Sequence, residues 1–185
     1  WKQLQFADVE RFTYKGADDW DVDGFIVKPI GWQADKKYPL IFSIHGGPAG
    51  QYGVDWFHEF QVYAAKGYGV LFTNPRGSTG YGKTFSKLDN GDLREGAYKD
   101  IGALLDWIKT RPDLDADRIV VGGGSYGGHM TLAVSYLYSD RIRCSVDVVG
   151  PSNFVTFLQN TSGYRQDLRR AEYGDERDPK MRAFL

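Results

Sequence analysis

Apolar residues recur along the chain with two different periods. Near-continuous apolar runs, which indicate strands buried on both faces of a sheet, occupy 38–47, 68–74, 118–123 and 144–150. Helical spacing follows the first three runs, at 56–67, over Ala97, Ile101, Leu104, Leu105 and Ile108, and at 126–139. Two shorter stretches, 11–16 and 23–29, flank the turn-rich ADDWDV and are predicted to pair as antiparallel strands.

Strands that alternate with helices predict an α/β fold, with a mainly parallel sheet covered by helices on both faces. The antiparallel pair at the start fits the edge of such a sheet. No repeat or long linker divides residues 1–185, so we expect them to belong to one domain. From Pro151 onward the chain is aromatic and polar, then heavily charged. Because this segment follows the end of a strand, we expect it to border a substrate pocket, without assigning a role to any of its residues.

Composition narrows the class of partner. Hydrophobic residues make up 42%, charged residues 25%, and the net charge is −1, so nothing indicates binding to nucleic acid or to a membrane surface. The single cysteine, Cys144, cannot form an internal disulfide and is predicted to be a small buried core residue, which favours a cytoplasmic location. The chain starts at WKQLQFADVE without a methionine or a signal-like leader, and we expect it to begin inside a longer protein.

The stretch VVGGGSYGGHM at 120–130 contains the candidate catalytic residue. Gly123-Gly124-Ser125-Tyr126-Gly127 fits the G-x-S-x-G nucleophile elbow, with a predicted strand before it and a helix after it. The alternative, a phosphate-binding glycine turn, requires G-x-G-x-x-G after an early strand, whereas these glycines follow a late strand and surround a serine. Ser125 is therefore the predicted nucleophile, and the Tyr126 N–H is one predicted oxyanion donor. The loop SIHGGPAG (43–50) is placed to supply the other donor, although it also fits an ordinary glycine turn.

Taken together, HGGP, NPRGSTGYG, GGSYGG and VDVVGPSNFVTF resemble, in this order, the catalytic domain of the prolyl oligopeptidase family of serine peptidases, and most closely its acylaminoacyl-peptidase and dipeptidyl-peptidase branch. The resemblance implies an α/β-hydrolase fold, short peptides as substrates, Ser125 as the nucleophile, and the Gly47 N–H as the second oxyanion donor. It implies no metal or cofactor. It also implies a β-propeller and a C-terminal segment elsewhere in the same protein, with a homo-oligomer possible, and a structural role for Arg76.

No histidine or acidic residue within residues 1–185 is predicted to complete a catalytic triad with Ser125. His45 is expected to shape the oxyanion loop, His58 to lie at a surface, and His129, where relatives more often carry an aromatic residue, to pack against a neighbouring element. In α/β-hydrolases the acid and the histidine both follow the serine, so we expect them beyond Leu185 and expect residues 1–185 alone to be inactive. Two alternatives stay open: a carboxylesterase or lipase, and a non-catalytic binding domain that kept the fold.

Overall fold

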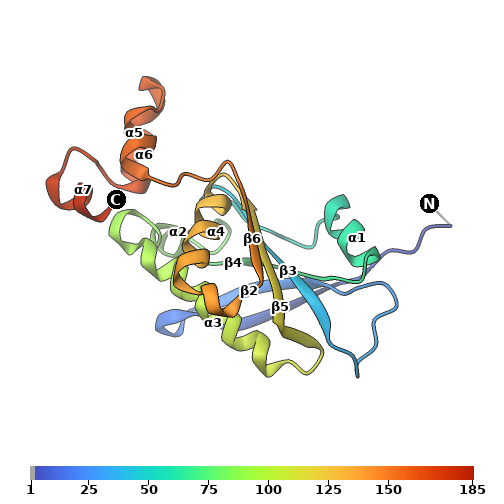
Figure 1. The fold of residues 1–185 in the computed structure, drawn as a ribbon. Coiled ribbons are helices and arrows are strands. Elements are labelled where there is room, and N and C mark those ends of the chain that lie inside the picture. The colour runs from blue at the N-terminus through green and yellow to red at the C-terminus, as the bar shows by residue number, and fades with distance from the viewer. Residues whose placement is uncertain (1–2) are drawn as a thin grey trace.

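The computed structural model describes residues 3–185 and is built around one six-stranded mixed sheet (Figure 1). The strand order is β1-β2-β4-β3-β5-β6. The predicted hairpin is confirmed, because β1 and β2 pair antiparallel; β4 also runs antiparallel to β2, whereas β4, β3, β5 and β6 are mutually parallel. The strands are β1 (Val9–Lys15), β2 (Asp21–Val27), β3 (Tyr38–Ile44), β4 (Gly69–Asn74), β5 (Leu114–Gly124) and β6 (Cys144–Val148).

Helices cover the two faces of the sheet unequally (Figure 1). The longer helices α3 (Glu95–Thr110) and α4 (Tyr126–Leu137) pack on one face, and α1 (His58–Ala65) packs on the other. The predicted stripe on α3 is confirmed, since all five of its apolar residues are buried in the larger core cluster. The remaining helical turns are α2 (Lys83–Lys87), α5 (Phe154–Gln159), α6 (Gly163–Tyr173), α7 (Pro179–Phe184), η1 (Ala17–Asp19), η2 (Gly91–Arg94) and η3 (Ser139–Arg141). Within residues 3–185, no helix has both the length and the apolar character needed to cross a membrane.

Two predictions about 144–150 are wrong. All five residues of β6 are exposed, and the Cys144 side chain is exposed rather than buried in the core. The reason lies in strand order: β6 is the edge strand of the described sheet and hydrogen-bonds only to β5. An apolar run looks the same in sequence whether its strand is central or at an edge. The predicted burial is therefore correct for β4, in which every residue is buried, and wrong for β6.

The polar loop after β4 is fixed by a buried ion pair. Arg76 donates from Nε to one carboxylate oxygen of Asp100 at 3.0 Å and from Nη2 to the other at 2.9 Å. It also binds Asp18 and the carbonyl of Gly96. Arg76 thus joins the end of β4 to α3 and η1, in the structural role expected for it.

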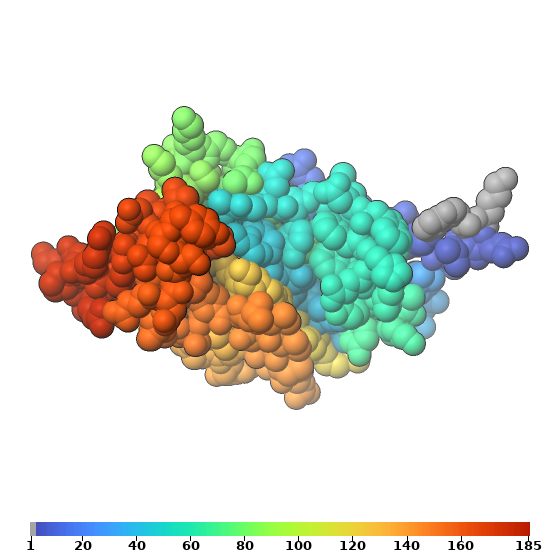
Figure 2. Space-filling model, turned by 90° about the horizontal axis from the view of Figure 1, so that it is seen from above, coloured from blue at the N-terminus to red at the C-terminus, as the bar shows by residue number. Residues whose placement is uncertain are grey.

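The charged segment after Pro151 folds into α5, α6 and α7, which extend away from the sheet (Figure 1). Seen from above, this segment forms a lobe beside the chain around residue 90 (Figure 2). Both α6 and α7 contact η2 there. The lobe therefore sits next to the loops at the carboxyl ends of the parallel strands, where the candidate site lies.

Candidate active site

Ser125 occupies a strained turn between β5 and α4. Its φ of 57° and ψ of −121° place a non-glycine residue in a sparsely populated region of backbone space. The residue is exposed, and its backbone N–H donates to the carbonyl of Val148 on β6 at 2.9 Å. A serine held in such a turn at the end of a strand is the defining feature of a nucleophile elbow.

The glycines on either side of Ser125 are required by packing. A Cβ at Gly123 would lie 2.5 Å from the Gly127 carbonyl oxygen and 2.7 Å from the Ile44 carbonyl oxygen. A Cβ at Gly127 would overlap that same Ile44 oxygen. Strand β5, helix α4 and the end of β3 are thus packed backbone against backbone, which is possible only without side chains at these positions.

The loop after β3 brings the predicted oxyanion donors to the serine. Because β3 and β5 are parallel neighbours, with Ile44 beside Gly123, their carboxyl ends meet. A Cβ built on Gly46 would lie 3.9 Å from Ser125 Oγ, so the loop backbone passes beside the hydroxyl. Tyr126 is the first residue of α4, where N–H groups lack intrahelical acceptors. Ser125 and Tyr126 therefore lie at the carboxyl ends of the parallel strands, beside the loop that contains Gly46 and Gly47.

His45 uses both ring nitrogens within this loop. Nδ1 lies 2.7 Å from the Gly46 carbonyl oxygen, which can only accept, so Nδ1 donates and Nε2 accepts from the Ser78 hydroxyl at 2.9 Å. Burial lowers the pKa of His45, which keeps the ring neutral. This histidine shapes the oxyanion loop, as expected.

His129 is likewise held by its neighbours. Nδ1 donates to the Pro151 carbonyl at 2.9 Å, Nε2 accepts from the Tyr98 hydroxyl at 2.5 Å, and the ring packs edge-on against Phe154. Burial lowers the pKa of His129 to about 4. The expectation that it packs rather than acts as a base is met. Among residues 3–185, no histidine nitrogen lies within hydrogen-bond distance of the Ser125 hydroxyl.

His129 should make the fold sensitive to acid. In the unfolded chain it takes up a proton near pH 6.5, but in the folded chain only near pH 4, so the free energy of unfolding should fall by about 3 kcal/mol as the pH drops between these values. In His129→Phe this contribution should vanish. The free energy of unfolding, measured with urea at pH 4.5 and at pH 7, should then differ less between the two pH values than in the parent protein. The buried carboxyl of Asp89, whose pKa burial raises to about 7, titrates with the opposite sign, but it is present in both proteins and its contribution cancels. An unchanged slope would contradict the prediction; the exposed His58→Phe is the control.

The comparisons with known proteins decide the family. The sequence profile of the prolyl oligopeptidase family matches residues 54–183, most of the chain. The chain belongs to this family.

Named members of the family resemble the chain in sequence and in structure. It is 42% identical over 149 residues to the uncharacterized peptidase YuxL of Bacillus subtilis, and 37% identical over 134 residues to dipeptidyl aminopeptidase BIII of Pseudoxanthomonas mexicana. These alignments cover 80% and 71% of the chain. Among solved structures, the acylaminoacyl peptidase of Pyrococcus horikoshii superposes with a TM-score of 0.86 at 29% identity, over 98% of the chain and 30% of that peptidase.

The chain spans only about a fifth of the length of the curated relatives it matches, 22% of YuxL and 19% of the aminopeptidase. The solved relatives are peptidases with an α/β-hydrolase catalytic domain, and the described sheet, elbow and flanking helices are part of that fold. The family resemblance drawn from the four motifs is confirmed.

The sequence did not predict the roles of two residues near the site, Tyr173 and Asp89. The Tyr173 hydroxyl, on α6, donates to the Gly47 carbonyl at 2.7 Å and so ties the lobe to the oxyanion loop. The Tyr126 hydroxyl donates to Asp89, a buried residue of the polar loop whose pKa burial raises to about 7. Both contacts join residues far apart in sequence, and no local pattern marks them. Tyr173 in particular sits in a charged stretch that reads as a solvent-exposed helix.

Proposed function

We propose that Ser125 is the nucleophile of a serine peptidase that cleaves short peptides through an acyl-enzyme. The single observation that carries this proposal is the strained, exposed serine at the elbow, with the Gly46–Gly47 backbone beside its hydroxyl. A merely structural turn has no need of a strained non-glycine residue at its apex. The relatives named above are all peptidases, which supports acyl transfer from a peptide over other chemistry.

The arrangement supports the following chemistry. Ser125 Oγ attacks the peptide carbonyl carbon, its proton passes to a base, and the carbonyl oxygen becomes an oxyanion that the N–H groups of Gly47 and Tyr126 stabilise. Collapse of the tetrahedral intermediate breaks the C–N bond, and the leaving amine takes the proton. Water then hydrolyses the ester, which restores the Ser125 hydroxyl. No step calls for a metal or an organic cofactor.

We place the base and its acid beyond Leu185 in the full-length protein. The proposal is supported by the engagement of His45 and His129 with other partners. It is also supported by the greater length of the relatives, which leaves room for the last strands of a hydrolase sheet and for a β-propeller. Under this proposal the 185-residue chain alone hydrolyses peptides poorly, because an unassisted serine is a weak nucleophile.

Labelling with a fluorophosphonate tests the assignment directly. The full-length protein should gain one phosphonyl adduct, and peptide mapping should place it on Ser125. An adduct elsewhere, or none, would favour the non-catalytic binding domain. Comparing kcat/KM on matched peptide and ester substrates separates a peptidase from an esterase: a marked preference for the ester, with no measurable peptide hydrolysis, would reject the peptidase.

Tyr173 should affect turnover through the oxyanion loop. Tyr173→Phe keeps the ring but removes the hydrogen bond to the Gly47 carbonyl and the one accepted from Arg169. We expect the loss at Gly47 to lower kcat about fivefold, the equivalent of one ordinary hydrogen bond. With an uncharged peptide, which makes no ion pair with Arg169, KM should change little, because the Gly47 contact holds the enzyme and not the ground-state substrate. Steady-state kinetics check this. The exposed Tyr164→Phe, on the same helix, is the control, and equal kinetics for both variants would refute the effect.

A further inference from the structure

A cavity of about 500 Å³ lies between α5 and α6, next to the candidate active site. Its wall at Gly150 and Pro151 follows Val148, whose carbonyl accepts the Ser125 N–H. Gly150 also packs against the first turn of α4, where a Cβ would lie 2.5 Å from the His129 nitrogen. On the α6 side, Arg169 of the lining donates to the Tyr173 hydroxyl, which in turn donates to the Gly47 carbonyl, so the cavity adjoins the loop that passes beside Ser125.

The lining of the cavity is polar and positively charged. Among the described residues that line it, two are cationic, Arg165 and Arg169, and none is anionic. Asn153 and Asn160 supply further polar groups, and Phe157 supplies an apolar surface. Such a lining suits a ligand that carries a negative charge on a short apolar stem.

Arg169 is held in place within this cavity. Its Nη1 donates to the Tyr173 hydroxyl at 2.8 Å, and its guanidinium lies 5.6 Å from the centre of the Phe157 ring. Its one carboxylate neighbour is Glu172, at 3.7 Å, which is beyond hydrogen-bond distance. The remaining N–H donors of this half-buried guanidinium are thus available to a ligand.

Arg165 lies one helical turn before Arg169, on the same side of α6, and is exposed. Within residues 3–185, no carboxylate lies within ion-pair distance of it, although most other arginines of the chain are paired. Two arginines one helical turn apart thus line the same cavity, one fixed and one without a carboxylate partner, and guanidinium groups are the donors that recognise a carboxylate.

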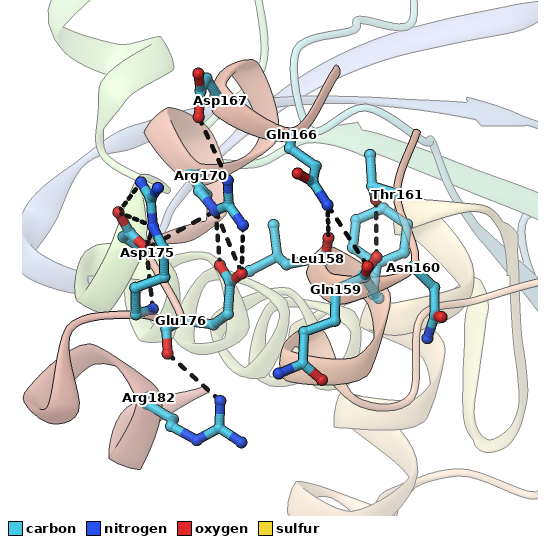
Figure 3. Close-up of polar contacts among 12 residues, drawn as sticks. Leu158, Gln159, Asn160, Thr161, Gln166, Asp167, Arg170, Asp175, Glu176 and Arg182 are labelled. Carbon is cyan, nitrogen blue, oxygen red and sulfur yellow. Dashed lines mark hydrogen bonds and ion pairs between the residues drawn. The ribbon is translucent and has the colours of Figure 1, made fainter. Parts of the chain in front are cut away.

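The walls of the cavity are braced against each other. Gln166, between the two arginines, donates from Nε2 to the Leu158 and Gln159 carbonyls at the end of α5 (Figure 3). At the other end of α6, Arg170 pairs with Glu176 at 2.6 Å (Figure 3). Because both helices are tied to each other and to the following chain, the site is formed before a ligand arrives, which lowers the entropic cost of binding.

We propose that this cavity binds a carboxylate of the peptide substrate and makes the enzyme prefer peptides that place a carboxylate there. The proposal rests on the peptidase function proposed above and names its substrate class. The carboxylate has two possible sources, an aspartate or glutamate side chain at the residue held beside Ser125, or the C-terminal carboxylate of the peptide. Both present the same planar pair of oxygens to the two guanidinium groups.

Binding to the full-length Ser125→Ala protein tests the site without turnover. Three peptides of equal length are compared by calorimetry: one with glutamate and an amidated C-terminus, one with glutamine and a free C-terminus, and one with glutamine and an amidated C-terminus. We expect the first or the second to bind at least about tenfold more tightly than the third, as a charge-assisted pair of hydrogen bonds would give. Which of the two binds identifies the source of the carboxylate.

The preference should be lost when Arg165→Gln is added and kept when Arg118→Gln is added. Arg118 lies within β5, seven residues before Ser125 and outside the cavity lining, and its replacement by glutamine makes the same change in net charge. Equal affinity for the three peptides, including no measurable binding of any, would overturn the carboxylate site, as would a preference that survives Arg165→Gln. Fluorophosphonate labelling reports separately on Ser125. Labelling of Ser125 without a preference for a peptide carboxylate would overturn this inference alone, and absent labelling would overturn the proposed function.

Discussion

Replacing Ser125 with alanine should lower kcat/KM for peptide hydrolysis by the full-length protein about 10⁶-fold, the scale of loss seen when a serine nucleophile is removed. The reason is geometric as well as chemical. The elbow places this one hydroxyl beside the Gly46–Gly47 backbone, and the packing of Gly123 and Gly127 leaves no room for another residue to take over. Oxyanion donors alone would sustain only a small residual rate over water.

The substitution should leave the fold intact, since alanine removes one exposed oxygen. Circular dichroism and thermal unfolding of the variant should therefore match the parent protein. Ser139→Ala, in η3 just beyond the far end of α4, is the matched control and should keep full activity. If Ser125→Ala retained more than about one thousandth of the activity, Ser125 could not be the nucleophile.

Replacing Asp100 with alanine should destabilise the fold by about 3–5 kcal/mol, because it removes the buried carboxylate that pairs with Arg76 and leaves only the exposed carboxylate of Asp18 beside that buried guanidinium. The side chain of Asp100 is 0% exposed and that of Arg76 is 5% exposed. Asp100 also accepts the backbone N–H groups of Ala17 and Arg76, so η1 and the loop after β4 lose a common acceptor on α3 at once. Chemical denaturation should show a lower midpoint, measured by fluorescence of the buried aromatic residues.

Asp106→Ala is the control for this loss, because Asp106 lies on the same helix and pairs with Arg141 at 2.6 Å but has a 70% exposed side chain. An exposed pair contributes about 0–1 kcal/mol, so the control should stay near the parent stability. Similar losses in the two variants would show that burial of the Arg76–Asp100 pair is not what fixes the loop after β4.

The parts of the molecule that sequence predicts well are those set by neighbours along the chain. The stripe on α3 and the turn around Ser125 depend on residues within a few positions of one another, so their spacing is diagnostic. Burial of β6 depends instead on what lies beyond the edge of the sheet, which an apolar run cannot reveal. The contact of Tyr173 with Gly47 spans 126 residues, and only the packed structure brings these two together.

The bond between Tyr173 and Gly47 has a consequence for engineering this protein. Helix α6 carries both arginines of the cavity and also Tyr173, whose hydroxyl donates to the carbonyl of Gly47 in the oxyanion loop. Grafting α6 from a relative to change which peptides are accepted would therefore also disturb the chemical step, unless the tyrosine is transferred at the same register. Substitutions that change peptide selectivity without loss of activity should accordingly lie on the α5 side of the cavity, where the side chains do not also hold the oxyanion loop.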